Sequence, residues 1–160
     1  MIRVFRLNPK RHRATSFSGA GGKTVAGRWN LAGTPIVYSS ATESLAFLEL
    51  FVNVSTITLR SLSRDYDSVE AHLTSKAIYE VQLQNLPRDW RELTPSRSTQ
   101  ELGTQWMSEL KFLAISVPST IFPGERNYLI NPKHPEFSSG CLVQKEQPIY
   151  PDPRILAKLA

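Results

Sequence analysis

Leu45-Ala46-Phe47-Leu48-Glu49-Leu50-Phe51-Val52 is the stretch that decides how the middle of this chain folds. It is almost entirely apolar and follows Ser40-Ala41-Thr42-Glu43, which matches the capping box that begins a helix. We therefore predict a helix over about residues 41–54. Glu49 lies near its middle, where burial of a carboxylate without a partner costs several kcal/mol. A functional site accounts for that cost, and a structural ion pair with an arginine is the alternative.

Two shorter segments precede this helix, and each carries a residue suited to the same site. They are Gly27-Arg28-Trp29-Asn30 and Pro35-Ile36-Val37-Tyr38. The guanidinium of Arg28 is suited to a two-pronged bond with phosphate, with a surface ion pair as the alternative. The ring of Tyr38 either packs in the core or stacks on a planar heterocycle. Because these residues and Glu49 are close in sequence, we predict that they line one cleft.

The length and composition are typical of a single globular domain. The chain has 160 residues, enough to bury a sizeable core, and we predict one domain over residues 1–160. A single cysteine, Cys141, excludes an intramolecular disulfide and suits a reducing compartment. The N-terminus has no apolar signal core, and no apolar run approaches the roughly eighteen residues of a membrane span. We therefore predict a cytoplasmic protein that does not associate with membranes.

The charge of the chain favours an anionic partner without identifying one. The net charge is +5, with a pI of about 9.6. Its tight cluster of cations is Lys10-Arg11-His12-Arg13, for which a solvated loop is the simpler interpretation. No helix-turn-helix, zinc-finger or aromatic–basic pattern accompanies the cluster. We therefore predict no direct, specific nucleic-acid binding by this chain.

The rest of the pattern indicates many short strands and few helices. A second helix is predicted from Thr99 to about Leu110, and the charged stretch 55–75 is predicted to be irregular or partly helical. A loop is predicted over residues 7–24, and strands over residues 2–6, 25–29, 36–39, 77–83, 112–117 and 127–130, with one or two more in the proline-rich tail. Because strands and helices do not alternate regularly, the predicted class is α+β.

Several motifs that suggest other chemistry are incomplete. Gly19-Ala20-Gly21-Gly22-Lys23-Thr24 lacks the first glycine of a phosphate-binding loop, since Phe17 stands at that position. Cys141 is better explained as a small buried side chain than as a nucleophile. No metal site is predicted, because only one cysteine is present and the three histidines are far apart: His12, His72 and His134.

Further short motifs follow one another along nearly the whole chain. They are Phe5-Arg6, Gly27-Arg28-Trp29-Asn30, Gly33-x-Pro35, Tyr38, Ala46-x-x-Glu49, Pro87-x-x-Trp90, Gly103-x-x-Trp106, Val117-Pro118-Ser119 and Asn127-Tyr128-Leu129-Ile130-Asn131-Pro132. In this order and spacing they resemble the RES domain, the toxin half of RES–Xre toxin–antitoxin pairs. The charged stretch 55–75 is longer than is typical of that family.

The resemblance implies a fold similar to ADP-ribosyltransferases and an enzyme that consumes NAD⁺ and arrests growth. Cleavage of the nicotinamide–ribose bond passes through an oxocarbenium-like cation, which the carboxylate of Glu49 would stabilise. Arg28 and Arg6 would hold the pyrophosphate, Tyr38 would stack on nicotinamide, and Ser119 would position the ribose or the amide. The catalytic set is then Glu49, Arg28 and Ser119, and the NAD⁺-binding set is Arg6, Arg28, Tyr38, Ser119 and Asn131, with no metal.

The resemblance also implies a partner, an Xre-type helix-turn-helix antitoxin that neutralises the toxin in an oligomeric complex and supplies any DNA binding. Other functions remain open. One is a protein ADP-ribosyltransferase, in which a side chain replaces water or phosphate as the acceptor. Another is a basic module that binds nucleic acid or protein without catalysis. An RNA-cleaving toxin has the weakest support, because no local pair of histidine with histidine or lysine is present.

Overall fold

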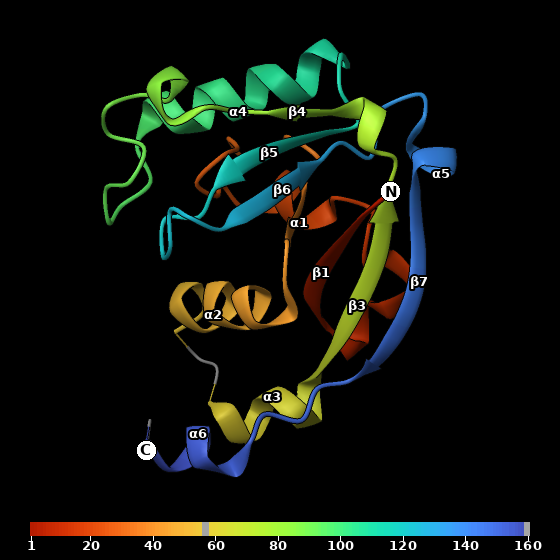
Figure 1. Cartoon of the computed structure of the whole chain (residues 1–160), viewed down its shortest axis with the longest axis vertical. Coiled ribbons are helices and arrows are strands. Elements are labelled where there is room, and N and C mark those ends of the chain that lie inside the picture. Colours follow the sequence, from red (N-terminus) through yellow and green to blue (C-terminus); the bar gives the residue numbers. More distant parts are fainter. Residues whose placement is uncertain (56–57, 159–160) are drawn as a thin grey trace.

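A seven-stranded mixed sheet carries the fold in the computed structural model, which describes residues 1–55 and 58–158 (Figure 1). The order of the strands across the sheet is β4-β5-β6-β2-β1-β3-β7. Only β4 and β5 run parallel among these described strands. Their bounds are β1 (Ile2–Pro9), β2 (Val37–Ser40), β3 (Tyr66–Leu73), β4 (Ile78–Glu80), β5 (Ala114–Pro118), β6 (Arg126–Ile130) and β7 (Cys141–Pro148).

The sheet consists of two parts that join narrowly. β1 and β2 share one registered pair, Phe5 with Ser40, whereas β1 pairs with β3 along its whole length. The two parts run in clearly different directions, and helix α2 (Glu43–Asn53) lies in the angle between them (Figure 1). α2 packs against both β1 and β2. The helix therefore brings its side chains to the line where the two parts of the sheet diverge.

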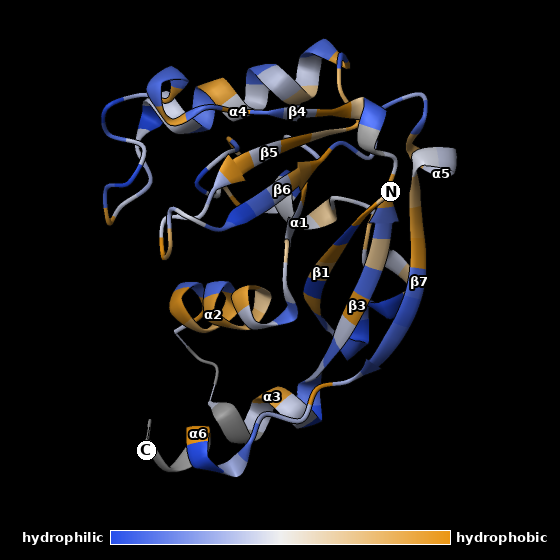
Figure 2. Cartoon of the chain, in the orientation of Figure 1, coloured by the Kyte–Doolittle hydropathy of each residue, from blue (hydrophilic) through white to orange (hydrophobic). Residues whose placement is uncertain are grey.

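Helix α2 forms where the sequence predicts a helix, but with a different cap. Thr42 precedes it in an extended conformation, and its side chain accepts a hydrogen bond from the backbone N–H of Leu45 at 3.1 Å. Ser40, the predicted cap, instead ends strand β2. Figure 2 shows α2 largely in the hydrophobic colour, and its own residues Leu45 and Ala46 are buried.

Five further helices and three 3₁₀ turns are found in the described part of the chain. They are α1 (Ala20–Thr24), α3 (Leu59–Asp65), α4 (Arg97–Glu109), α5 (Phe137–Gly140) and α6 (Pro153–Lys158), with 3₁₀ turns at Lys10–Thr15, Ser75–Ala77 and Leu83–Asn85. Met107 of α4 packs against Ile115 and Leu129 of the sheet. Among the helices in the described part of the chain, none is long and apolar enough to cross a membrane.

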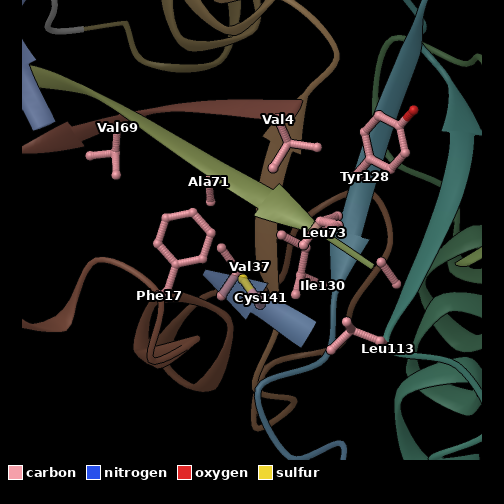
Figure 3. Packing of buried hydrophobic residues seen from close by; sticks show 11 residues of the cluster. Val4, Phe17, Val37, Val69, Ala71, Leu73, Leu113, Tyr128, Ile130 and Cys141 are labelled. Atoms are coloured by element: carbon pink, nitrogen blue, oxygen red, sulfur yellow. The ribbon is translucent and has the colours of Figure 1, made fainter. Parts of the chain in front are cut away.

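Three clusters of buried side chains hold the layers together. The cluster shown in Figure 3 joins both parts of the sheet through residues such as Val4, Val37 and Leu73. A second cluster lies under α4, and a third joins α2 to β1 through Ala46 and Leu7. Full burial of one such aliphatic side chain contributes about 1.5–3 kcal/mol. Cys141 belongs to the first cluster, which confirms that it is a buried apolar side chain.

The structure differs from the sequence-based expectations in several segments. The proline-rich tail, for which only strands were predicted, contains α5 and α6 besides β7, and the strand predicted over residues 77–83 is confined to β4. Residues 25–29, predicted as a strand, form a turn in which Gly27 and Asn30 bridge each other. The predicted loop 7–24 contains the end of β1, a 3₁₀ turn and α1, and the stretch 55–75 contains α3 and β3. Residues 56–57 of that stretch lie outside the described residues. Strand β3 was not predicted because its acidic residues made the stretch look exposed and irregular. Their partners are distant in sequence, as in the contact of Asp67 with Arg13.

Candidate active site

A pocket of about 500 Å³ opens where α2 meets the junction of β1 and β2. This volume is in the range of small-molecule and cofactor sites. Four of the six predicted site residues line it: Arg6, Arg28, Tyr38 and Glu49. Ser119 and Asn131 do not. Much of the remaining wall is apolar, formed by residues including Phe5, Leu7, Pro9, Leu50, Val54 and Tyr66.

Glu49 is held by uncharged hydrogen-bond donors. Its Oε1 accepts from Oγ of Ser119 at 2.8 Å and from Nδ2 of Asn127 at 2.5 Å. Across the described residues, no ion pair joins Glu49 to an arginine. The alternative prediction, that Glu49 forms a structural ion pair with an arginine, is therefore wrong for the described part of the chain. Both donors are neutral groups, so neither of these hydrogen bonds comes from a cation.

Ser119 lies behind Glu49 and not on the surface of the pocket. It is completely buried, and its Oγ accepts hydrogen bonds from the backbone N–H groups of Ile121 at 3.1 Å and Phe122 at 3.3 Å. Its hydroxyl proton is thus directed to Glu49. Direct contact between Ser119 and a ribose or amide stays a prediction, whereas its bond to the carboxylate is part of this structure.

Arg28 faces the pocket from the turn at residues 27–30. Its Nη1 donates to the carbonyl oxygen of Trp90 at 3.0 Å, and its Nη2 to that of Leu93 at 3.5 Å. Burial lowers the pKa of Arg28, and the negative charge of Glu49 partly offsets that shift. An arginine remains protonated throughout the physiological range. The guanidinium is therefore a cation near Glu49 whose hydrogen-bond partners, within the described ranges, are carbonyl oxygens.

The turn that carries Arg28 is organised by the buried amide of Asn30. Its Nδ2 donates to the carbonyl oxygens of Gly22, Val25 and Leu31 at 3.0–3.1 Å. Its Oδ1 accepts from the backbone N–H of Gly27 and from the Tyr38 hydroxyl, at 3.0 and 2.7 Å. The turn is thereby fixed on both sides of Arg28.

Two glycines permit the close contacts around this turn. A Cβ on Gly27 would lie 2.8 Å from both Oδ1 of Asn30 and the hydroxyl of Tyr38. A Cβ on Gly103 of α4 would lie 2.0 Å from the carbonyl oxygen of Trp29. Helix α4 also donates from Gln100 to the carbonyl oxygen of Gly27 at 3.0 Å. Glycine at positions 27 and 103 therefore allows the turn and α4 to approach each other closely.

Tyr38 presents only its ring to a ligand. Its hydroxyl donates to Asn30 and accepts from the backbone N–H of Trp29 at 3.0 Å. Burial raises the pKa of this phenol above its ordinary value, so the group is neutral. The ring lines the pocket beside Arg28, as the stacking interpretation requires.

Arg6 is a second guanidinium in the pocket, and it is almost completely enclosed. Its Nη1 donates to the carbonyl oxygen of Tyr38 at 2.9 Å, while within residues 1–55 and 58–158 its buried Nε has no partner. Burial lowers its pKa. A buried cation with an unused donor is well suited to an anionic ligand.

Asn131, the last predicted residue, supports the turn after β6. Its Nδ2 donates to the carbonyl oxygen of Met107 at 2.8 Å, and its Oδ1 accepts from the backbone N–H of Lys133 at 3.0 Å. It is buried outside the pocket lining, and its role in ligand binding stays a prediction. Throughout the described part of the chain, no group of three or more histidine, cysteine or acidic side chains is placed to hold a metal ion.

Two residues that organise the site, Asn30 and Asn127, have no role that the sequence alone predicts. Both stand in the motifs quoted above, next to apolar residues such as Trp29 and Tyr128. The apolar neighbours indicate that these amides are buried. A buried amide requires hydrogen-bond partners, so both residues are expected to organise the structure around them. The identity of those partners depends on the tertiary fold.

Comparison with known proteins assigns this architecture to a family. The RES domain family model matches residues 3–152, and the chain therefore belongs to the RES domain family. A Sphingobium sp. (strain YBL2) protein named Prs ADP-ribosylating toxin is 36% identical over 148 residues, covering 92% of this chain and 91% of that protein. Toxin Res of Yersinia enterocolitica is 32% identical over 139 residues, covering 87% of this chain and 89% of that protein. The family predicted from the motifs is confirmed.

A solved structure supports the fold. A chain in the crystal structure of the M. tuberculosis MbcT–MbcA toxin–antitoxin complex superposes with a TM-score of 0.73. The match covers 99% of this chain and 88% of that chain, at 16% sequence identity. At this identity the comparison shows a shared fold, and it confirms the α+β class.

Proposed function

We propose that this chain is a toxin that binds NAD⁺ in the pocket and cleaves the bond between nicotinamide and ribose. One observation carries the proposal: the carboxylate of Glu49 is held by neutral donors beside Arg28 and forms no ion pair with it among the described residues. The site thus keeps an unneutralised negative charge next to groups suited to a dianionic pyrophosphate.

The chemistry needs that charge more than it needs a strong acid. Nicotinamide leaves with the electron pair of the broken bond and becomes neutral, so its departure requires no protonation. Positive charge then develops on the ribose carbon and its ring oxygen, where Glu49 stabilises it. Water adds to this carbon and releases a proton, giving ADP-ribose. Phosphate adds in the same way to give the corresponding sugar phosphate.

Two guanidinium groups supply the anion-binding part of the proposed complex. Arg6 has an unused buried Nε, and Arg28 exchanges its carbonyl partners for phosphate oxygens. The ring of Tyr38 stacks on a planar base, and Ser119 acts by holding Glu49. These assignments agree with the residue types that bind dinucleotides elsewhere.

A second candidate reaction is transfer of ADP-ribose to a protein side chain. It is favoured by the relative named Prs ADP-ribosylating toxin, which is 36% identical to this chain. The first bond cleavage is the same, and only the acceptor differs. Glu49 then also orients the attacking side chain.

One experiment separates these reactions. The purified chain is incubated with NAD⁺ labelled in its adenylate part, with and without phosphate and a bacterial lysate, and nicotinamide release is followed. Label in free ADP-ribose indicates hydrolysis, label in the phosphate ester of ADP-ribose indicates phosphorolysis, and label in the protein fraction indicates transfer. Absence of nicotinamide release under all conditions would overturn the proposed function and favour a binding module.

We further propose that an Xre-type helix-turn-helix antitoxin neutralises this chain in the cytoplasm and supplies any DNA binding. Support comes from relatives named as toxins and from the toxin–antitoxin complex that shares the fold. The cation cluster gives little support to nucleic-acid binding, because Arg13 contacts Asp67 and Glu146, and Lys10 donates to the carbonyl oxygen of Ser63. We expect the antitoxin to act by occluding the pocket, so the purified complex should consume NAD⁺ more slowly than the free toxin. Equal rates would contradict occlusion.

A further inference from the structure

The two carboxylate oxygens of Glu49 have different surroundings. Oε1 accepts the two hydrogen bonds from Ser119 and Asn127, at 2.8 and 2.5 Å. Oε2 has a 3.3 Å contact with Nδ2 of Asn53, whose shorter bond, 2.7 Å, goes to the backbone carbonyl of Glu49. One oxygen is therefore bound to the protein, and the other is left to accept from a ligand.

The amide of Asn127 is itself oriented by a second residue. Ser40, at the end of β2, donates from its Oγ to Oδ1 of Asn127 at 2.7 Å. The two residues face each other in the register of β2 and β6, and Ser40 is 2% exposed. With Oδ1 fixed against this hydroxyl, Nδ2 must point to Glu49. The opposite rotation would place an amide oxygen against a carboxylate oxygen and lose a donor.

The second donor is fixed from the same hairpin. Ser119 follows β5, and Asn127 lies on β6, the strand that pairs with β5. Both donors therefore move as one unit, and they hold a carboxylate that comes from α2. A side chain with several rotatable bonds is thereby held in one orientation before any ligand binds.

We propose that Asn127, oriented by Ser40, is a positioning residue that binds Oε1 of Glu49 and leaves Oε2 as the oxygen that faces the reacting ribose. This inference rests on the proposed function and extends it to two residues that do not carry out the chemistry themselves. Asn127 raises the rate by fixing the direction of the negative charge, and it leaves substrate affinity nearly unchanged.

The decisive variant is Asn127→Asp, which keeps size and shape but replaces the donor with a negatively charged oxygen facing Glu49. We expect kcat for NAD⁺ cleavage to fall about 100-fold with KM within about threefold of wild type. Ser40→Ala, which removes only the group that orients the amide, should lower kcat about tenfold. Asn85→Asp, an exposed change of the same type, is the matched control and should have no effect. A rise in KM with unchanged kcat would overturn the proposal and indicate that Asn127 contacts substrate.

A double-mutant cycle with Glu49→Gln excludes a merely structural role. If Asn127 acts through the carboxylate, Asn127→Asp should lower kcat less than about threefold further in a chain that already carries Glu49→Gln. Equal effects in both backgrounds would overturn the proposal. Should Asn127→Asp not fold, the same cycle is made with Ser40→Ala.

The failure of this inference is distinguishable from failure of the proposed function. If the wild-type chain releases no nicotinamide from NAD⁺, the proposed function is wrong, regardless of the results for the variants. In that event, crystal structures of wild type and Asn127→Asp still test the positioning role. The Glu49 side chain should keep one rotamer in wild type and change it in the variant, and an unchanged rotamer would overturn the inference.

Discussion

The acidic side chains of Asp67 and Glu49 are stabilised by the fold in opposite ways. Asp67, at the start of β3, has a completely buried side chain and contacts two cations, Arg13 at 2.5 Å and Lys10 at 3.9 Å. Glu49 lines the pocket and is held by the neutral donors Ser119 and Asn127. Charge is neutralised at the first site and preserved at the second.

The difference separates a structural acid from the acid that we propose to act in catalysis. Burial of a carboxylate requires either an opposite charge or several hydrogen bonds. A cation partner makes the pair stable but removes the field that would act on a ligand. Neutral donors stabilise the carboxylate without cancelling its charge, so Glu49 retains the ability to stabilise a developing cation. The comparison leads to four tests.

The largest effect is expected for Glu49→Gln. Glutamine keeps the shape of the side chain and breaks no ion pair among the described residues, so the melting temperature should change by less than about 4 °C. The loss of charge should lower kcat by about 100-fold or more while NAD⁺ still binds. Enzyme assays, calorimetry and equilibrium binding measure the three quantities. A well-folded variant that cleaves NAD⁺ normally would contradict the catalytic role.

The next effect is expected for Arg28→Lys. An ammonium keeps the charge but does not reproduce the two-pronged geometry of a guanidinium, so kcat/KM should fall about 10–100-fold. Arg97→Lys, in an exposed pair with Glu101, is the matched control and should leave turnover unchanged. Wild-type kcat/KM in Arg28→Lys would show that Arg28 serves the fold and does not clamp phosphate.

The local pattern of the sequence was sufficient for some of these features. The apolar run around Glu49 predicts α2, and the motif Gly27-Arg28-Trp29-Asn30 locates the arginine. The pairing of Asn127 with Glu49 was not predictable, because the residues are 78 positions apart and meet only through the register of β6 with β2. Strand β3 was missed for the same reason, since the cation that neutralises Asp67 comes from another part of the chain.

The third test removes charge at the structural acid. Asp67→Asn removes the charge from a buried side chain that pairs with Lys10 and Arg13, of which Arg13 keeps Glu146 as a second partner. The free energy of unfolding should therefore fall by about 1–3 kcal/mol. Turnover should remain within about twofold of wild type, because Asp67 is outside the pocket lining. Denaturant titration measures the stability, and Asp152→Asn, in an exposed pair with Arg154, is the control. If Asp67→Asn lost kcat but kept normal stability, Asp67 would have a role in catalysis and not the structural role assigned to it here.

The smallest effect is expected for the thiol of Cys141. This buried ionisable group stays neutral in the folded chain, whereas buried Asp67 is paired with cations. Burial raises the pKa of its thiol to about 12, so almost no thiolate is present in the folded chain at pH 8. Iodoacetamide should therefore label the native protein far more slowly than the urea-unfolded protein, with Cys141→Ala as the unlabelled control. Because the pKa is higher in the folded state, the contribution of the thiol to stability is complete below about pH 9. It declines as pH rises through the folded pKa, since the unfolded chain ionises first. Rapid labelling of the native protein at pH 8 would show that Cys141 is accessible and charged.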